Sequence, residues 1–358
     1  ILTMDGHTKI KVPMSKPYVT SDTRRLVLEA VESSYIGTGP FIQKFEEVWA
    51  KENNYRFGSA CSSGTAALHL ALTALDIGEG DEVIVPEFTM VATAWAVTYT
   101  GARPVFVDCD NTLNIDIAKI ESAITAKTKA IIVVHVYGRR VNMNKIAEIA
   151  IAHDIAVVED SAEAHGILPE KSDIACFSFY SNKIISTGEG GMCLTNSRLY
   201  KDRIDTLRSM SFDKNRTYLH PHLGFNYRMT NIQAAIGLSQ LETLGWIKSK
   251  RRMIEMWYDA YLPAIVKMPK RDVLWYYDID THGDAEQLKN ILLNEYGIET
   301  RSFFKPMSMQ PMYSTGQFPT NAMKWGQRGL LLPTYMDITE EQVKYVCECI
   351  AKSLPLVV

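Results

Sequence analysis

Short apolar runs and helical patterns alternate along the first half of the chain. The runs are apolar at nearly every position, and Ala- and Leu-rich stretches at helical spacing separate them. Strands are expected at 82–86, 103–108, 130–136 and 155–160, with helices at 66–75, 90–100, 115–124 and 144–153. Strands buried on both faces and joined by helices predict an α/β fold with a mainly parallel central sheet.

Beyond residue 160 the pattern changes. Two shorter strands and then three helices are expected, at 176–180, 191–195, 198–210, 231–244 and 248–262. The last helix leads into a smaller C-terminal α+β unit. Because no low-complexity linker separates the two parts, we predict a large domain at 1–245 that packs closely against a small domain at 246–358. In such folds ligands bind beyond the carboxyl ends of the strands.

Composition and charge exclude several classes of protein. The 38 Lys and Arg against 41 Asp and Glu leave a net charge of −3, which excludes a broad electrostatic surface for nucleic acid. No apolar run approaches the roughly 18–20 residues that cross a bilayer, and the N-terminus lacks the apolar core of a secretory signal. Six cysteines without a CxxC pair favour buried thiols over a metal site. We expect a metal-free, cytoplasmic protein that binds neither nucleic acid nor membrane.

Small residues stand directly before the helix expected at 66–75, namely Ser63, Gly64 and Thr65. Small residues at a helix N-terminus expose backbone N–H groups where the helix dipole favours an anion. This segment therefore predicts a phosphate site, with an ordinary Ser or Thr N-cap as the alternative.

Two ionisable residues follow expected strands. Asp160 ends the strand at 155–160, where its carboxylate would keep a pyridine nitrogen protonated, or would cap a helix instead. Lys183 lies between an apolar strand and the glycine turn at 188–191, where solvation is poor. Desolvation lowers the pKa of an amine and makes it a Schiff-base nucleophile, whereas an ordinary loop lysine would have no such role. A further segment at 224–231 holds Asn226, which helix capping does not explain.

The order of these features, a phosphate site, an acid and then a lysine, is that of fold-type I enzymes that use pyridoxal 5′-phosphate (PLP). In detail the chain resembles the sugar aminotransferases of the DegT/StrS type. The resemblance is carried by SSGTAALHLAL (62–72), GDEVIVP (80–86), EDSAEAHG (159–166), FSFYSNKIISTGEGGM (177–192) and GFNYRMTNIQAAIGLSQLE (224–242).

The resemblance implies a role for each matching residue. Lys183 would bind the cofactor covalently and carry the proton to C4 of the sugar, while Asp160 would pair with the pyridinium nitrogen and make the ring an electron sink. Glu163 would lie near the 3′ oxygen. The remaining cofactor contacts are implied for Ser63, Gly64, Thr65, Ser178 and, from a second subunit, Asn226. The last contact implies a homodimer with shared active sites.

Two positions depart from the family pattern. An aromatic residue usually covers the PLP ring where this chain has Met90, so that either Met90 or Phe88 is expected to cover it. A histidine is usual where this chain has Lys305, which could bind a diphosphate as a point charge or be a solvated loop residue. The substrate side is expected to comprise Thr38, Arg301, Lys305 and Tyr313.

The implied reaction is transfer of the amino group of L-glutamate, through pyridoxamine phosphate (PMP), to C4 of a nucleotide-linked 4-keto-6-deoxyhexose. GDP-4-keto-6-deoxymannose would give GDP-perosamine, and UDP- or dTDP-4-keto-6-deoxyglucose, giving a viosamine product, is the alternative. A C3 dehydratase of this fold has histidine in place of Lys183, which excludes that activity here. A non-catalytic regulatory protein is disfavoured because Lys183, Asp160 and Thr65 are all present.

Overall fold

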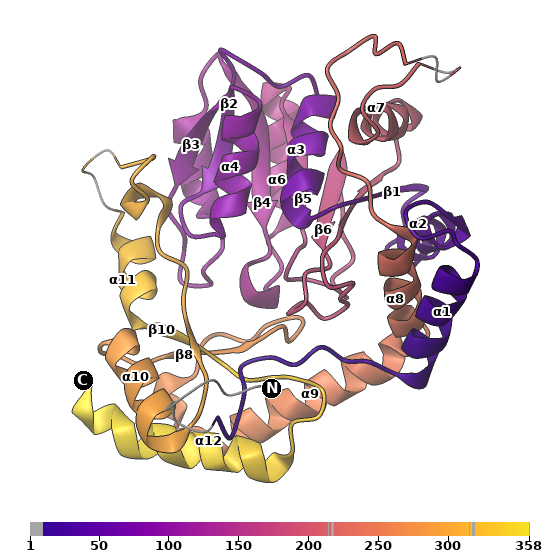
Figure 1. Ribbon diagram of the computed structural model, residues 1–358. Coiled ribbons are helices and arrows are strands. Elements are labelled where there is room, and N and C mark those ends of the chain that lie inside the picture. Colours follow the sequence, from indigo (N-terminus) through magenta and orange to yellow (C-terminus); the bar gives the residue numbers. More distant parts are fainter. Residues whose placement is uncertain (1–9, 214, 216–217, 315, 317–318, 358) are drawn as a thin grey trace.

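The computed structural model describes residues 10–213, 215, 218–314, 316 and 319–357. Within these ranges a seven-stranded sheet and a three-stranded sheet organise the chain (Figure 1). The larger sheet has the order β1-β7-β6-β5-β4-β2-β3. Its strands are β1 (Phe57–Cys61), β2 (Glu82–Pro86), β3 (Arg103–Val107), β4 (Thr128–Val134), β5 (Ala156–Asp160), β6 (Ile174–Ser178) and β7 (Gly191–Thr195).

The direction of the strands confirms the mainly parallel α/β fold. Every neighbouring pair from β3 to β6 is parallel, and only β7 runs against its two neighbours, β6 and β1. The carboxyl ends of β1, β2, β4, β5 and β6 therefore meet at one edge of the sheet.

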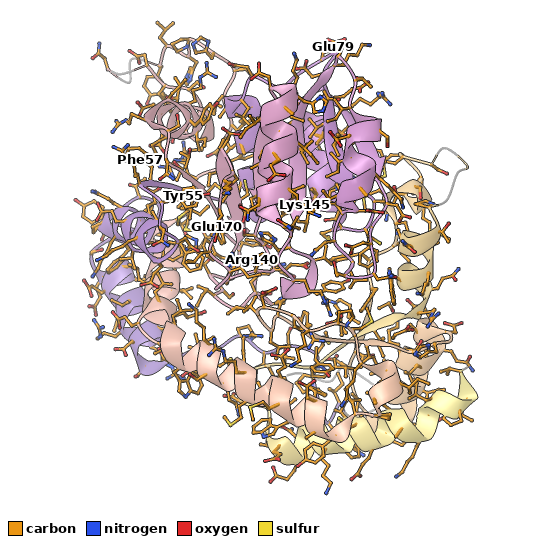
Figure 2. The ribbon with its side chains drawn as sticks, turned by 180° about the vertical axis from the view of Figure 1, so that it is seen from behind. Tyr55, Phe57, Glu79, Arg140, Lys145 and Glu170 are labelled. Atoms are coloured by element: carbon orange, nitrogen blue, oxygen red, sulfur yellow. The ribbon has the colours of Figure 1, made fainter. Side chains whose placement is uncertain are left out.

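Helices cover both faces of this sheet (Figures 1 and 2). Successive residues of a strand point to opposite faces, so the apolar strands place side chains in a core on each side. Val83 and Val85 pack in one core and Ile84 in another. The first face carries α3 (Gly64–Ala74), α4 (Val91–Tyr99) and α7 (Arg198–Arg208), and the second carries α5 (Ile120–Ala123) and α6 (Met143–His153). Figure 2 shows the second face, where Lys145 of α6 and the ion pair of Arg140 with Glu170 (2.9 Å) lie.

Several elements have bounds that local pattern did not reveal. Strand β1 was not predicted because its sequence, FGSAC, is built mainly of small residues. The helix expected at 115–124 is a 3₁₀ turn followed by the single turn of α5. Two helices before β1 were also missed, α1 (Ser21–Glu32) and α2 (Pro40–Glu52), which pack against α8 (Asn231–Leu241).

The 3₁₀ turns are Ile117–Lys119, Val136–Gly138, Ala264–Val266, Met307–Met309 and Leu354–Leu356.

The smaller sheet has the antiparallel order β8-β10-β9 and its own apolar core. Its elements are β8 (Tyr277–Asp280), β9 (Arg301–Ser302), β10 (Gly329–Leu332), α9 (Leu244–Tyr261), α10 (Ala285–Tyr296), α11 (Thr320–Arg328) and α12 (Glu340–Ser353). The expected boundary at residue 245 falls in the first turn of α9, a helix that reaches from one unit to the other (Figure 1). The N-terminal segment also crosses over, since Lys11 and Val12 donate backbone hydrogen bonds to Gly297. None of the helices in the described ranges combines the length and apolar character that a membrane span demands.

Candidate active site

A cavity of about 320 Å³ opens at the edge of the sheet where the parallel strands end. Its wall is made of turns that follow β1, β2, β5 and β6, together with residues of the smaller unit. The sequence-predicted residues that line it are Ser63, Gly64, Thr65, Met90, Asp160, Glu163, Ser178, Lys183 and Arg301. The structure thus brings together residues from segments that are more than 200 positions apart in the chain.

The N-terminus of α3 forms an anion cradle in this wall. Ser63 is the N-cap, and its Oγ accepts a hydrogen bond from the Ala66 N–H (3.1 Å). The Ser63 carbonyl oxygen accepts the first hydrogen bond of the helix, from the Ala67 N–H. The N–H groups of Gly64 and Thr65 come before this bond and therefore have no partner within the helix. Free N–H groups at the positive end of a helix favour an anion such as phosphate.

Two glycines make this cradle sterically possible. A Cβ on Gly64 would lie 2.7 Å from the Cβ of Ser178, and a Cβ on Gly191 would lie 2.2 Å from the carbonyl oxygen of Ser63. Only glycine therefore allows the turn after β1 to lie so close to the ends of β6 and β7. The glycine turn at 188–191 thereby packs the cradle against the strand that precedes Lys183.

Asp160 lies at the end of β5 with its carboxylate buried in the wall. Oδ2 accepts a hydrogen bond from the Thr93 hydroxyl (3.0 Å), and Oδ1 accepts from the Ala162 N–H (3.1 Å). Burial raises the pKa of Asp160, while these two hydrogen bonds oppose the change. A buried carboxylate held by two donors is positioned to pair with a cationic ring nitrogen.

Lys183 follows β6 and places its amine in the cavity, where the side chain is 11% exposed. Nζ lies 3.9 Å from Glu163 Oε1 and 4.0 Å from the centre of the Trp275 ring. Burial lowers the pKa of Lys183, and the nearby carboxylates only partly offset that effect. A desolvated amine of lowered pKa is the nucleophile that Schiff-base chemistry needs.

Glu163 is the second carboxylate near the amine. Burial raises its pKa to about 7, although Lys183 opposes the change. Its Oε2 accepts a hydrogen bond from the Tyr137 N–H (2.9 Å). Tyr137 adopts a positive φ of 49°, a conformation that costs free energy in a bulky residue and that directs its N–H toward the carboxylate.

Two of the expected cofactor residues lie outside the wall of the cavity. Phe88 is fully buried in an aromatic cluster with Tyr137, Phe303 and Phe304. Met90 instead lines the cavity and is half exposed. Asn226 is exposed on the surface, where it pairs with Ser209 in an isolated bridge.

Of the residues expected to bind the substrate, some line the cavity and others lie away from it. Arg301 lines the cavity, whereas Thr38 is exposed elsewhere on the chain. Lys305 Nζ donates to the carbonyl oxygen of Gly326 (3.0 Å). Tyr313 packs on Phe106, and its hydroxyl lies 2.7 Å from that of Thr98. Neither Lys305 nor Tyr313 reaches the cavity wall in this chain.

Sequence reasoning did not assign several residues of the site. Thr89, Asn182 and Trp275 line the cavity, and Thr93 holds Asp160. A signal existed for Thr93, because it lies one helical turn after Thr89 and their hydroxyls are 3.1 Å apart. Nothing in the local sequence distinguishes Trp275, which comes from the smaller unit.

Residues 17–351 match the DegT/DnrJ/EryC1/StrS aminotransferase family. The chain belongs to this family. Membership confirms the predicted class of sugar aminotransferase and its PLP cofactor. The relatives include GDP-perosamine synthases of Escherichia coli O157:H7 (42% identity over 95% of this chain and 97% of the relative) and Caulobacter vibrioides (41% over 94% and 96%). A solved structure of NtdA from Bacillus subtilis with bound PMP is 28% identical, with a TM-score of 0.86 over 98% of this chain and 87% of that one.

The residues of the cavity fit a PLP molecule. The cradle of Gly64 and Thr65 suits its phosphate, the buried carboxylate of Asp160 suits its ring nitrogen, and the amine of Lys183 suits its aldehyde. A side chain at Gly64 or Gly191 would clash with Ser178 or Ser63, so the close-packed backbone of the cradle depends on these two glycines. When bound, PLP supplies an electron sink for the carbon from which a proton is removed.

Replacing Asp160 with asparagine is expected to slow transamination by about 10²–10³-fold, since a neutral amide cannot stabilise a cationic ring nitrogen. The fold should persist, because the amide oxygen can still accept from Ala162. The rate of the glutamate half-reaction measures the effect. Asp173→Asn is the control, because Asp173 binds the Val157 N–H away from the cavity. An Asp160→Asn variant with the rate of the wild type would contradict this role.

Proposed function

We propose that this enzyme transfers the amino group of L-glutamate to C4 of GDP-4-keto-6-deoxymannose and so forms GDP-perosamine. The observation that carries the proposal is the cavity in which the Lys183 amine lies between Glu163 and Trp275, beside an anion cradle. The choice of nucleotide is supported by two relatives named GDP-perosamine synthase, which are 42% and 41% identical over nearly the whole chain.

The residues of the site would have separate roles in binding the cofactor and in moving the proton. Lys183 holds the cofactor covalently and then, as a free amine, moves the proton between the two reacting carbons. Asp160 holds the ring nitrogen in its charged form, and Gly64 and Thr65 hold the phosphate. Met90, which lines the cavity, would cover the ring through its polarisable sulfur, since Phe88 is buried elsewhere. Arg301 at the cavity wall supplies a cation for a carboxylate or diphosphate.

The active enzyme would be a homodimer whose two subunits share each active site. The surface of the chain without a partner carries large exposed apolar side chains, including Tyr35 (60% exposed), Tyr218 (84%) and Leu223 (87%). Leu223 and Tyr218 lie in the loop that extends beyond α7 (Figure 1), close in sequence to Asn226. Large apolar side chains exposed within one segment favour a protein–protein contact there. A partner subunit seated there would receive Asn226 at its phosphate cradle.

Subunit mixing tests this arrangement. Lys183→Ala homodimers should be inactive because both sites lack the reactive amine, and Asn226→Asp homodimers should be weakly active because a carboxylate repels phosphate. An equal mixture should regain about a quarter of the wild-type activity, because half of the dimers are mixed and each mixed dimer has one intact site. No recovery after subunit exchange, verified by mass, would contradict the shared site.

The substrate is tested with one sample of holoenzyme. L-Glutamate should remove the visible absorption band of the cofactor, and GDP-4-keto-6-deoxymannose should restore it. UDP-4-keto-6-deoxyglucose, tested separately, distinguishes the alternative that gives a viosamine product. Restoration by the UDP sugar alone would replace the proposed substrate, and restoration by neither would refute both sugars. The reaction would take place in the cytoplasm, where the six free, buried cysteines would stay reduced.

A further inference from the structure

Trp275 of the smaller unit makes two separate contacts with the catalytic turn of the larger unit. The face of its indole ring lies 4.0 Å from Nζ of Lys183. Its Nε1–H donates a hydrogen bond of 2.8 Å to the carbonyl oxygen of Asn182, the residue directly before Lys183. The same side chain therefore contacts both the reactive amine and the peptide bond that carries the lysine.

The backbone of Trp275 is itself held firmly. Its carbonyl oxygen accepts hydrogen bonds from Nη1 of Arg251 (2.8 Å) and from the hydroxyl of Thr334 (2.6 Å). Arg251 comes from α9 and is buried, and its Nη1 also donates to the carbonyl oxygen of Leu274 (3.1 Å). A buried guanidinium that binds main-chain carbonyls must obtain its hydrogen bonds there, which makes the geometry of this segment, directly before β8, costly to change.

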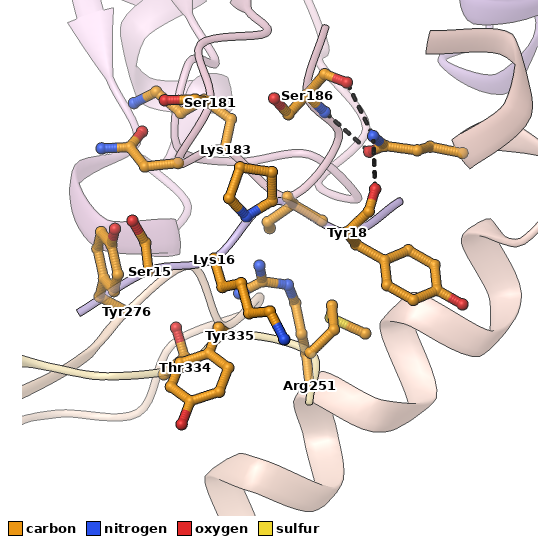
Figure 3. A pocket seen from close by; sticks show the side chains of 15 residues that line it. Ser15, Lys16, Tyr18, Ser181, Lys183, Ser186, Arg251, Tyr276, Thr334 and Tyr335 are labelled. Carbon is orange, nitrogen blue, oxygen red and sulfur yellow. Dashed lines mark hydrogen bonds between the residues drawn. The ribbon is translucent and has the colours of Figure 1, made fainter. Parts of the chain in front are cut away.

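A small space adjoins the turn that carries Lys183. A small cavity of about 20 Å³ adjoins Ser181 and Lys183, and Figure 3 shows Arg251, Thr334 and Tyr276 around it. A void gives no contacts to the atoms that line it. The hydrogen bond from Trp275 fixes this turn from the side of the smaller unit, in addition to the bonds within the larger unit from the Lys183 N–H to Tyr180 (2.8 Å) and from the Ile185 N–H to His165 (3.2 Å).

We propose that Trp275 is the positioning residue for Lys183 in the transamination reaction. Its ring contacts the free amine and keeps it in position, and its N–H fixes the turn that carries the lysine. This role rests on the proposed function, in which the lysine must leave the cofactor and return to the same carbon. A ring face attracts the amine while it is protonated and accepts no proton from it, so that the neutral amine that reacts is released there without breaking a hydrogen bond. Glu163 forms an ion pair with the same amine at 3.9 Å, beyond hydrogen-bond distance.

The test separates covalent capture of the cofactor from its non-covalent binding. PMP occupies the same cradle but forms no bond to Lys183, so that its affinity reports the cradle alone. In covalent capture of PLP, Nζ of Lys183 bonds to the aldehyde carbon and water leaves, which reports the position of the amine. Both are measured on apoprotein, and borohydride reduction followed by peptide mapping verifies that Lys183 is the residue captured.

Trp275→Phe keeps a ring and loses the N–H, whereas Trp275→Leu loses both. We expect covalent capture to slow by about threefold in the first variant and at least about tenfold in the second, since small misplacement of a reacting group is costly. The affinity for PMP should change by less than about twofold. Trp257→Leu is the matched control, because Trp257 also carries a lysine over its ring, Lys250 at 4.5 Å, and lies outside the cavity wall.

Wild-type capture rates in both Trp275 variants would overturn the proposal. A parallel loss of PMP affinity would also overturn it, since that result indicates a general disturbance of the site. If Trp275→Leu does not fold, Trp275→Phe decides alone, with slowed capture and unchanged PMP affinity as the supporting outcome. These measurements use neither glutamate nor a nucleotide sugar. An enzyme that captures PLP normally but aminates no sugar would therefore refute the proposed function and leave this inference standing.

Discussion

Replacing Lys183 with alanine is expected to abolish turnover, with a fall in rate of more than about 10⁴-fold. The loss is large because one amine serves as covalent holder of the cofactor and as the acid and base of the proton transfer, and either role alone is worth about 10²–10⁴-fold. Lys183 is also the one lysine in the described wall of the cavity. Single-turnover measurement of 2-oxoglutarate formed from L-glutamate gives the rate.

The control for this experiment is Lys201→Ala. Lys201 is likewise largely buried, but its amine pairs with Asp205 (2.6 Å) away from the cavity, so that its loss should leave the rate unchanged. The Lys183→Ala protein should fold at least as well as the wild type, because a cation in a desolvated position is removed. Activity like that of the wild type in Lys183→Ala would contradict both the site and the proposed reaction.

Replacing Asp278 with asparagine is expected to lower the free energy of unfolding by about 3–5 kcal/mol, the range typical for breaking a buried ion pair. Asp278 of β8 is fully buried and joins two arginines. Its Oδ2 lies 2.7 Å from Nη2 of Arg139 in the larger unit, and its Oδ1 lies 2.7 Å from Nε of Arg271. The variant would leave the buried guanidinium of Arg139 without a counter-charge in the contact between the two units, whereas Arg271 would keep its ion pair with Glu255 (3.0 Å).

The pH dependence of this effect follows from the pKa of Asp278. Burial alone would raise that pKa, but Arg139 and Arg271 together hold it below its ordinary value. Because the folded-state pKa is below the unfolded-state value of about 3.9, the ion pairs contribute their full stability above that pH. The contribution is lost as the pH falls through the folded-state pKa. The difference between wild type and variant should therefore shrink in acid.

Urea unfolding at pH 7 and at lower pH measures both effects. Asp337→Asn is the matched control, because Asp337 pairs with Lys16 on the surface, where both side chains are more than half exposed. Exposed ion pairs contribute little, so that this variant should unfold with the wild-type midpoint. Equal midpoints for Asp278→Asn and Asp337→Asn would show that the buried cluster does not stabilise the contact between the units.

The meeting of the candidate site's main residues in one cavity could be predicted because they belong to contiguous motifs at strand ends. Asp160 closes an apolar strand, Lys183 follows the next, and the small residues from Ser63 to Thr65 begin a helix. Parallel strands bring their carboxyl ends to one edge, so that the order of the segments already implied that these groups would meet. The resemblance to sugar aminotransferases then gave each residue a role, and comparison with known proteins confirmed the family.

Residues whose role depends on long-range packing were beyond such reasoning. Phe88 and Met90 are two positions apart, and only the aromatic cluster around Phe88 decides which of them faces the cavity. Lys305 carries the charge that a diphosphate site needs, yet the structure turns its amine toward Gly326. In both cases the chemistry of the side chain was plain, while its direction depended on neighbours distant in sequence.

The amino-acid sequence by itself determined the parallel sheet, the anion cradle and the pairing of an acid with a lysine, because strand periodicity, helix termini and strand ends are local properties. Only the tertiary structure decided that Trp275 lies over the Lys183 amine and that Asp278 joins Arg139 to Arg271. These contacts form where the smaller unit packs on the larger one. Their geometry comes from the packing of whole elements, which no local pattern encodes.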